Sequence, residues 1–154
     1  MQVLVTGASG FVGNEVVKDL LARGHEVKPL VRKGSEKKLK ERHKVEVVLG
    51  DCLHPEVLHQ AASGCDAVIH LVGIIREFPG KGVTFERVHV QATRNVVDAT
   101  KAAGARRYLH MSALGARPQP ADPYHVTNFQ ADEYVINSGL AYTIFRPSVI
   151  FNVT

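Results

Sequence analysis

The chain has 154 residues, of which 45% are hydrophobic and 22% charged, and this composition is typical of one globular domain with a real core. Its formal net charge is +4 at pH 7, and no apolar run is long enough for a membrane span, so we expect no integral membrane protein. No basic region precedes an apolar run, and Cys52 and Cys65 have neither metal nor redox spacing. We therefore expect a cytoplasmic protein with reduced thiols.

The chain opens with an apolar run at residues 3–6, followed by a glycine-rich turn and then by apolar residues of helical period. The turn reads Gly7-Ala8-Ser9-Gly10-Phe11-Val12-Gly13. A strand, a glycine turn and a helix N-terminus bind anions, because free N–H groups and the positive helix end point at the ligand. We expect Gly7 to turn the chain, Gly10 to admit a phosphate and Gly13 to pack the helix closely on the sheet. The alternative is a turn that binds nothing.

Apolar periodicity, β-branched runs and turn residues predict the elements that follow. Helices are expected at 11–23, 55–63, 84–103 and 124–137, with a basic helical segment at 35–42. Strands are expected at 26–31, 45–49, 66–72, 107–112 and 141–146. Pro29 falls inside the second strand, where it cannot donate to a ladder, so we expect a bulge there.

The strands alternate with helices along the chain, and this alternation predicts a doubly wound parallel sheet. Two halves of three strands give the order 3-2-1-4-5-6, with helices on both faces in a three-layer α/β Rossmann fold. The ligand is then expected at the carboxyl ends of the first and fourth strands. We expect residues 1–154 to form this one domain.

Much of the excess positive charge lies at residues 32–44. A solvated surface accounts for most of these charges, and an interaction module for an acidic partner is the alternative. No aromatic residues are interleaved and no nucleic-acid motif is present, so we expect no nucleic-acid partner.

Arg32 follows the second strand, where the adenine ribose of a dinucleotide would lie. A guanidinium there pairs with a 2′-phosphate and favours NADP, whereas an acid would accept from a 2′-hydroxyl and favour NAD. Residues 30–33 contain no acid. We therefore expect NADP more than NAD, the alternative being an ordinary surface arginine.

The histidines show no metal-ligand spacing, so we expect no metal site. His70 and His110 fall in central strands, where a hydrogen-bonded core residue is expected. His89 lies in the long helix, either on its surface, or partly buried, or facing the site as a proton shuttle.

Several motifs together resemble the short-chain dehydrogenase/reductases, most closely their atypical extended branch, near the complex I nucleotide-binding subunit and NAD-dependent epimerase/dehydratase-like proteins. These motifs are residues 6–13, Gly50-Asp51, His70-Leu71-Val72-Gly73, Met111-Ser112-Ala113, Tyr124 and Arg146-Pro147-Ser148. The resemblance implies an NAD(P)-binding domain whose cofactor contacts are Gly7, Ser9, Gly10, Phe11, Val12, Gly13, Arg32, Asp51, Cys52, Leu71, Val72, Gly73, Met111 and Pro147.

The family also suggests a task for each pocket segment. Asp51 and Cys52 would flank the adenine ring, although Asp51 also suits a turn or a helix cap before Pro55. Residues 71–73 would line the ribose and pyrophosphate, although Leu71 equally suits ordinary strand core.

Tyr124 and Ser112 match the family's catalytic tyrosine and serine, which transfer a proton to the substrate oxygen and hydrogen-bond it. The family has a lysine four residues after the tyrosine, and here that position is Asn128, which carries no charge to stabilise a phenolate. We therefore expect weak or no catalysis, unless another cation substitutes in space. The candidates are Lys101, Arg117 and Arg146.

The family continues past residues 146–151 into a substrate-binding lobe that we expect this chain to lack. Exposed apolar residues 149–151 would then favour self-association or a larger complex. The leading interpretation is a nucleotide-binding subunit or sensor. The alternatives are an NADP-dependent reductase or epimerase on a carbonyl or sugar-like substrate, and a basic interaction module.

Overall fold

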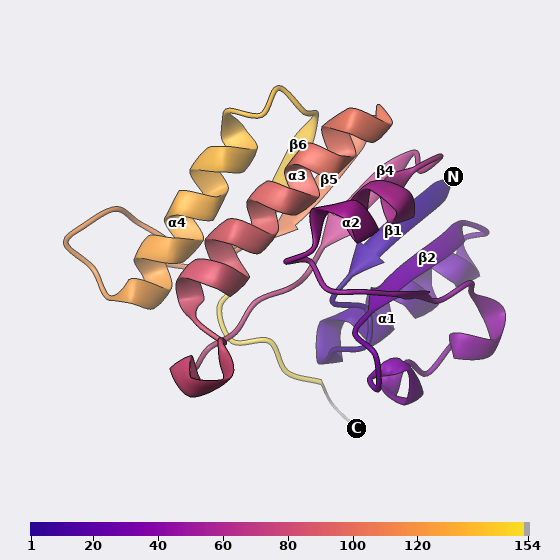
Figure 1. Ribbon diagram of the computed structural model, residues 1–154, viewed down its shortest axis with the longest axis horizontal. Helices are drawn as coiled ribbons and strands as arrows, with labels where there is room; N and C mark the ends of the chain where they lie inside the picture. Colours follow the sequence, from indigo (N-terminus) through magenta and orange to yellow (C-terminus); the bar gives the residue numbers. More distant parts are fainter. Residues whose placement is uncertain (153–154) are drawn as a thin grey trace.

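The computed structural model describes residues 1–152, and within these residues six parallel strands form one sheet flanked by helices (Figure 1). The strands are β1 (Gln2–Thr6), β2 (Glu26–Val31), β3 (Val48–Leu49), β4 (Ala67–His70), β5 (Arg107–Met111) and β6 (Tyr142–Phe145). The α-helices are α1 (Phe11–Ala22), α2 (Pro55–Ala62), α3 (Ala92–Ala103) and α4 (Pro123–Ile136). The spatial order β3-β2-β1-β4-β5-β6 confirms the predicted doubly wound α/β fold.

The helices divide unequally between the two faces of the sheet, with α1 behind it in Figure 1 and α2, α3 and α4 in front. Successive β1 side chains point to opposite faces, as strand geometry requires. Val3 and Val5 pack with Val17 of α1, whereas Leu4 packs with the cluster under α2 and α3. Both faces of the central strands are therefore buried, which a parallel sheet needs.

Pro29 causes no bulge, because the register from Gln2↔Glu26 to Thr6↔Leu30 is unbroken. The Val31 carbonyl accepts from Gly50 N–H at 3.0 Å, so Val31 faces β3. Backbone N–H and C=O groups of successive residues point to opposite sides of a strand, so the backbone of Pro29 points to the same side as that of Val31, toward β3. However, β3 pairs with β2 only from Leu30 onward. The missing N–H of Pro29 therefore costs no ladder bond, and the expected bulge was wrong.

The predicted basic helix at 35–42 was also wrong, since the segment forms two short 3₁₀ turns, η1 (Glu36–Lys38) and η2 (Arg42–Lys44). Leu39 between them is 1% exposed and anchors the segment on the core beside α1. The buried amide of Asn14 also holds it. Its Nδ2 donates to the carbonyls of Ser9, Gly10 and Lys38, and its Oδ1 accepts from Lys40 N–H.

Other elements differ in extent from the prediction. β3 and β4 are shorter than expected, and residues 71–72 lie beyond the end of β4. The expected helix at 84–103 divides into a π-helical turn, η4 (Glu86–Gln91), and α3. No helix within residues 1–152 is both long and apolar enough to cross a membrane.

Candidate functional site

The glycine turn between β1 and α1 is packed too closely for side chains. Gly7 has a φ of +68°, and a Cβ there would lie 3.0 Å from the Leu71 carbonyl group. A Cβ at Gly13 would lie 2.1 Å from Gly7 O and 2.7 Å from Ala8. Gly13 is thus in close contact with the glycine turn itself, whereas we predicted that it would let the helix pack closely on the sheet. Gly10 is the N-cap of α1 and contributes no capping side chain, so the first N–H groups of the helix face the space above the turn.

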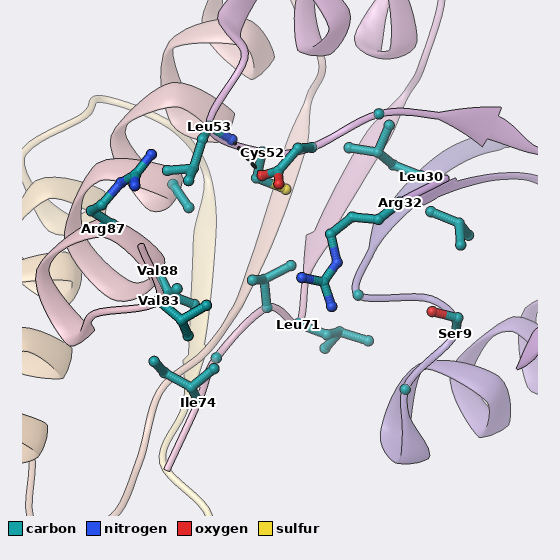
Figure 2. Close-up of a pocket in the computed structure, with 18 of the residues that line it drawn as sticks. Ser9, Leu30, Arg32, Cys52, Leu53, Leu71, Ile74, Val83, Arg87 and Val88 are labelled. Atoms are coloured by element: carbon teal, nitrogen blue, oxygen red, sulfur yellow. Dashed lines mark hydrogen bonds between the residues drawn. The ribbon is translucent and has the colours of Figure 1, made fainter. Parts of the chain in front are cut away.

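A cavity of about 430 Å³ opens above this turn at the carboxyl ends of β1, β2, β3 and β4 (Figure 2). Of the predicted cofactor residues, it is lined by Gly7, Ser9, Gly10, Arg32, Asp51, Cys52, Leu71, Val72 and Gly73. Five others do not line it: Phe11, Val12, Gly13, Met111 and Pro147. Phe11 is instead 57% exposed, and the Pro147 carbonyl accepts from Leu114 N–H.

A second wall of the cavity comes from residues 74–88, which the sequence analysis did not assign. Its lining residues are Ile74, Lys81, Gly82, Val83, Arg87 and Val88. The segment folds back on itself through an antiparallel bridge between Phe78 and Val83. The Glu77 carboxylate also accepts from Phe85 N–H at 2.8 Å. Pro79-Gly80-Lys81-Gly82 indicated a loop, but no spacing in the sequence indicated where that loop would lie.

The charges around the cavity are mainly positive, with Arg32, Lys81 and Arg87 set against Asp51. Figure 2 shows Arg32 extending between Leu71 and Ser9, and Arg87 on the opposite wall near Leu53. No ion pair to Arg32 forms within the described part of the chain. An anionic ligand is therefore favoured here.

Asp51 and Cys52 form the edge of the cavity beyond β3. Asp51 Oδ1 accepts from Leu53 N–H at 2.9 Å, so Asp51 stabilises the turn, while His54 is the N-cap of α2. Asn95 of α3 donates to the Cys52 carbonyl at 2.9 Å. Burial raises the pKa of the Cys52 thiol to about 12, so this thiol stays protonated.

Tyr124 lies in the first turn of α4, which begins after Asp122 because the Asp122 carboxylate accepts from His125 N–H. The half-buried tyrosine ring meets Phe85 and His89 edge-on, at centroid distances of 5.8 and 5.7 Å. Asn128 donates its amide to the backbone carbonyl of Tyr124 at 2.9 Å. The Asn128 side-chain amide is therefore hydrogen-bonded to the backbone of its own helix.

Ser112 follows β5 and donates its hydroxyl to Asp132 Oδ2 at 2.9 Å. Asp132 is fully buried, and Arg146 binds it through Nε at 3.0 Å and Nη2 at 2.9 Å. Burial raises the pKa of Asp132, and the Ser112 and Arg146 contacts offset part of that rise. The Ser112 proton thus points at a carboxylate of the core.

None of the three cations considered as substitutes for the missing lysine bonds to the Tyr124 hydroxyl. Arg146 is paired with Asp132, and Arg117 donates to the Gly115 carbonyl at 3.1 Å. Lys101 lies in the last turn of α3, at the end of the helix that returns toward the start of β5. Within residues 1–152 the Tyr124 hydroxyl has no hydrogen-bond partner from the chain.

His70 and His110 are the core residues that the sequence predicted. They are in register on β4 and β5, and their rings stack at a centroid distance of 5.6 Å. His70 Nδ1 lies 2.6 Å from the Thr6 hydroxyl. Burial lowers the pKa of both, that of His110 to about 4, so both rings are neutral near pH 7.

His89 was expected on the helix surface, or partly buried, or facing the site, and the structure instead buries it almost completely at 4% exposure. It lies between the loop after β4 and helix α4. The spacing is compatible with this burial, because His89 lies at helical spacing from Phe85, Ala92 and Val96, and these positions share one face of the expected helix.

A family model described as NAD(P)H-binding matches residues 7–153. The chain belongs to this NAD(P)H-binding family. A short-chain dehydrogenase/reductase superfamily protein from Agrobacterium tumefaciens, solved with bound NAD, superposes with a TM-score of 0.76 at 27% identity, over 95% of this chain and 48% of that one. The UDP-glucose 4-epimerase of Thermus thermophilus, in complex with NAD, shares the fold with a TM-score of 0.77 at 24% identity, over 95% of this chain and 54% of that one.

Curated relatives of the NAD(P)H-binding chain include the ceramide reductase of Caulobacter vibrioides, 32% identical over 97% of this chain and 46% of that protein. The uncharacterized sugar epimerase YhfK of Bacillus subtilis is 31% identical, over 99% of this chain and 73% of that protein. The chain thus spans about half the length of the ceramide reductase and of the Agrobacterium protein. These relatives confirm the resemblance to the short-chain dehydrogenase/reductase and epimerase superfamily.

Proposed function

We propose that the cavity binds NADP(H), with the pyrophosphate on the glycine turn and the 2′-phosphate on Arg32. The observation that carries this proposal is a guanidinium inside the cavity with no acid at residues 30–33 to accept from a ribose hydroxyl. Lys81 and Arg87 add positive charge on the other wall. NADP carries a phosphate that NAD lacks, so it gains more from these charges.

The test is calorimetric titration with NADPH and NADH, in the unmodified chain and in Arg32→Asp. We expect tighter NADPH binding, and a selective loss of roughly 1.5–3 kcal/mol in the variant, because a charge-assisted contact becomes a repulsion. Lys33→Asp is the matched control, since Lys33 is exposed and does not line the cavity. Equal affinities for NADPH and NADH in the unmodified chain would refute the NADP preference.

We further propose that the chain turns over slowly or not at all and serves as a nucleotide-binding subunit or sensor. Two contacts support this. Asn128 places no charge near Tyr124, and the Ser112 proton is directed to Asp132. A neutral amide gives a phenolate no Coulomb stabilisation, and proton transfer by a tyrosine depends on such assistance.

The second candidate is an NADP-dependent reductase or epimerase, favoured by the presence of Tyr124 and Ser112 and by the names of the relatives. NADPH oxidation with a panel of carbonyl compounds, followed against pH, separates the two. We expect Asn128→Lys to raise any residual rate and move its pH optimum down. Robust turnover of the unmodified chain that survives Tyr124→Phe would place the chemistry on other residues.

A further inference from the structure

His89 connects three parts of the molecule that are far apart in the sequence. Its Nδ1 lies 2.9 Å from the Thr127 hydroxyl of α4, and its Nε2 lies 3.1 Å from Ile74 N and 3.0 Å from Ile74 O. Its ring stacks on Phe85 at 5.4 Å and meets the edge of Tyr124. A buried imidazole with polar contacts at both nitrogens acts as a fixed link between the loop after β4 and α4.

The hydrogen bonds determine which nitrogen carries the proton. The Thr127 hydroxyl donates to the Pro123 carbonyl at 2.7 Å, so toward His89 it is an acceptor. His89 Nδ1–H therefore donates to Thr127, and the unprotonated Nε2 accepts from Ile74 N–H. This arrangement gives every donor in the link a partner, and burial, which lowers the pKa of His89 to about 4, keeps the ring neutral.

The residues that His89 holds belong to the wall of the cavity. Gly73, Ile74 and Val88 line it, and a Cβ at Gly73 would lie 3.7 Å from His89 Nε2. The bond to Ile74 N–H thus fixes the backbone just past β4. The bond to Thr127 fixes that backbone relative to the first turn of α4, which carries Tyr124.

The sheet order assigns this wall to one half of the ligand. Arg32 and Asp51 follow β2 and β3, on one side of β1, and would receive the adenosine half. With the pyrophosphate on the glycine turn, the second nucleoside must extend across the switch point, over the end of β4. That position is the backbone of residues 71–74.

We propose that His89 is a positioning residue for the nicotinamide half of the cofactor, through its bonds to Ile74 and Thr127. This inference rests on the proposed dinucleotide binding. It predicts that loss of the imidazole bonds weakens a ligand that carries nicotinamide and spares one that carries only adenosine phosphates.

The first experiment compares NADPH with 2′,5′-ADP, and NADH with ADP, in His89→Phe, which keeps a planar aromatic ring but makes neither hydrogen bond. We expect at least tenfold weaker dinucleotide binding and less than twofold change for the matching adenosine ligand. His89→Gln, whose amide can accept from Ile74 N–H, should restore dinucleotide affinity to within about threefold. The control is His59→Phe, the same change at an exposed position of α2.

Thr127→Val gives an independent variant if His89→Phe folds poorly, because it removes the acceptor for Nδ1–H and leaves the His89 ring in place. It also removes the bond of the Thr127 hydroxyl to the Pro123 carbonyl, which lies within α4. It should weaken the dinucleotide about threefold and leave the adenosine ligand unchanged. Equal weakening of both ligands, or no effect of either variant, would overturn the positioning role. If the unmodified chain binds none of the four ligands, the proposed function itself fails and the inference fails with it.

A ligand-free measurement tests the link separately. Long-range ¹H–¹⁵N spectra of the unmodified chain should show His89 protonated at Nδ1 and accepting at Nε2, and Thr127→Val should mix the two tautomers. The opposite tautomer in the unmodified chain would overturn the inference even where dinucleotide binding succeeds.

Discussion

Gly13→Ala is the sharpest test of how the turn and α1 fit together. The added methyl group would lie 2.1 Å from Gly7 O and 2.7 Å from Ala8, all backbone atoms that no side-chain rotation can move away. Alanine in a helix gains about 1 kcal/mol over glycine, whereas overpacking of this kind costs about 1–3 kcal/mol. The added Cβ would contact backbone atoms at distances shorter than those of real Cβ contacts. We therefore expect the cost of overpacking to exceed the gain in helix propensity, with a net loss of roughly 1–2 kcal/mol of unfolding free energy.

The same change should weaken nucleotide binding, because the backbone that must shift is the backbone that would hold the phosphates. Urea denaturation gives the stability, and NADPH titration gives the affinity, which we expect to fall about tenfold for each 1.4 kcal/mol of lost contact. Gly80→Ala is the matched control, since a Cβ there meets no atom within 4 Å and its φ is not left-handed. A Gly13→Ala chain with unchanged stability and affinity would refute the packing argument.

Three further predictions concern other parts of the molecule. Burial lowers the pKa of His89 and of His110 to about 4, so the stability that the neutral rings contribute is fully present above pH 6.5 and is lost as pH falls toward 4. With an unfolded pKa near 6.5, the loss of unfolding free energy at pH 5 is about 2 kcal/mol for each histidine. Urea unfolding curves that do not change between pH 7.5 and 5 would contradict this prediction. Asp132→Asn removes the buried negative charge that pairs with Arg146. Because the Arg146 side chain is 43% exposed, we expect a loss of about 1–3 kcal/mol in thermal unfolding, against less than about 0.5 kcal/mol for Asp19→Asn in an exposed pair. Val149 and Phe151 are 85% and 79% exposed, so we expect the chain to self-associate. Sedimentation at high concentration measures this, with Phe151→Ser as the comparison. If the unmodified chain is strictly monomeric and sediments like the Phe151→Ser variant, the prediction is contradicted.

The order of the elements and the place of the cavity followed from the sequence, because they depend on patterns that act locally. Residues 3–6 and the glycine turn predicted strand, turn and helix, and alternation with helices predicted a parallel sheet. Arg32 and Asp51 could be placed at the cavity for the same reason, since each directly follows a strand whose position in the sheet was predicted.

Contacts that depend on distant packing could not be predicted in this way. The wall at residues 74–88 is defined by the bridge between Phe78 and Val83 and by the hydrogen bonds of His89 to Ile74 and Thr127, and no periodic pattern indicates these contacts. The basic segment at 35–42 has many good helix formers, but Leu39 and Asn14 hold it in 3₁₀ turns, so tertiary contacts override propensity. The partner of Ser112 was hidden for a similar reason, since Asp132 lies 20 residues away on another element.

Asn14 has a consequence for the order in which the site assembles. Its four hydrogen bonds join residues only 4 to 26 positions apart, whereas β1 meets β4 through contacts 64 residues apart, such as Thr6 with His70. Short loops close at a lower entropic cost than long ones, so the glycine turn and its supporting segment can form early, as a nearly local structure. The wall that contains His89 must wait for β4 and α4. We therefore expect the phosphate end of the cavity to become protected from hydrogen exchange during refolding before the opposite end exists.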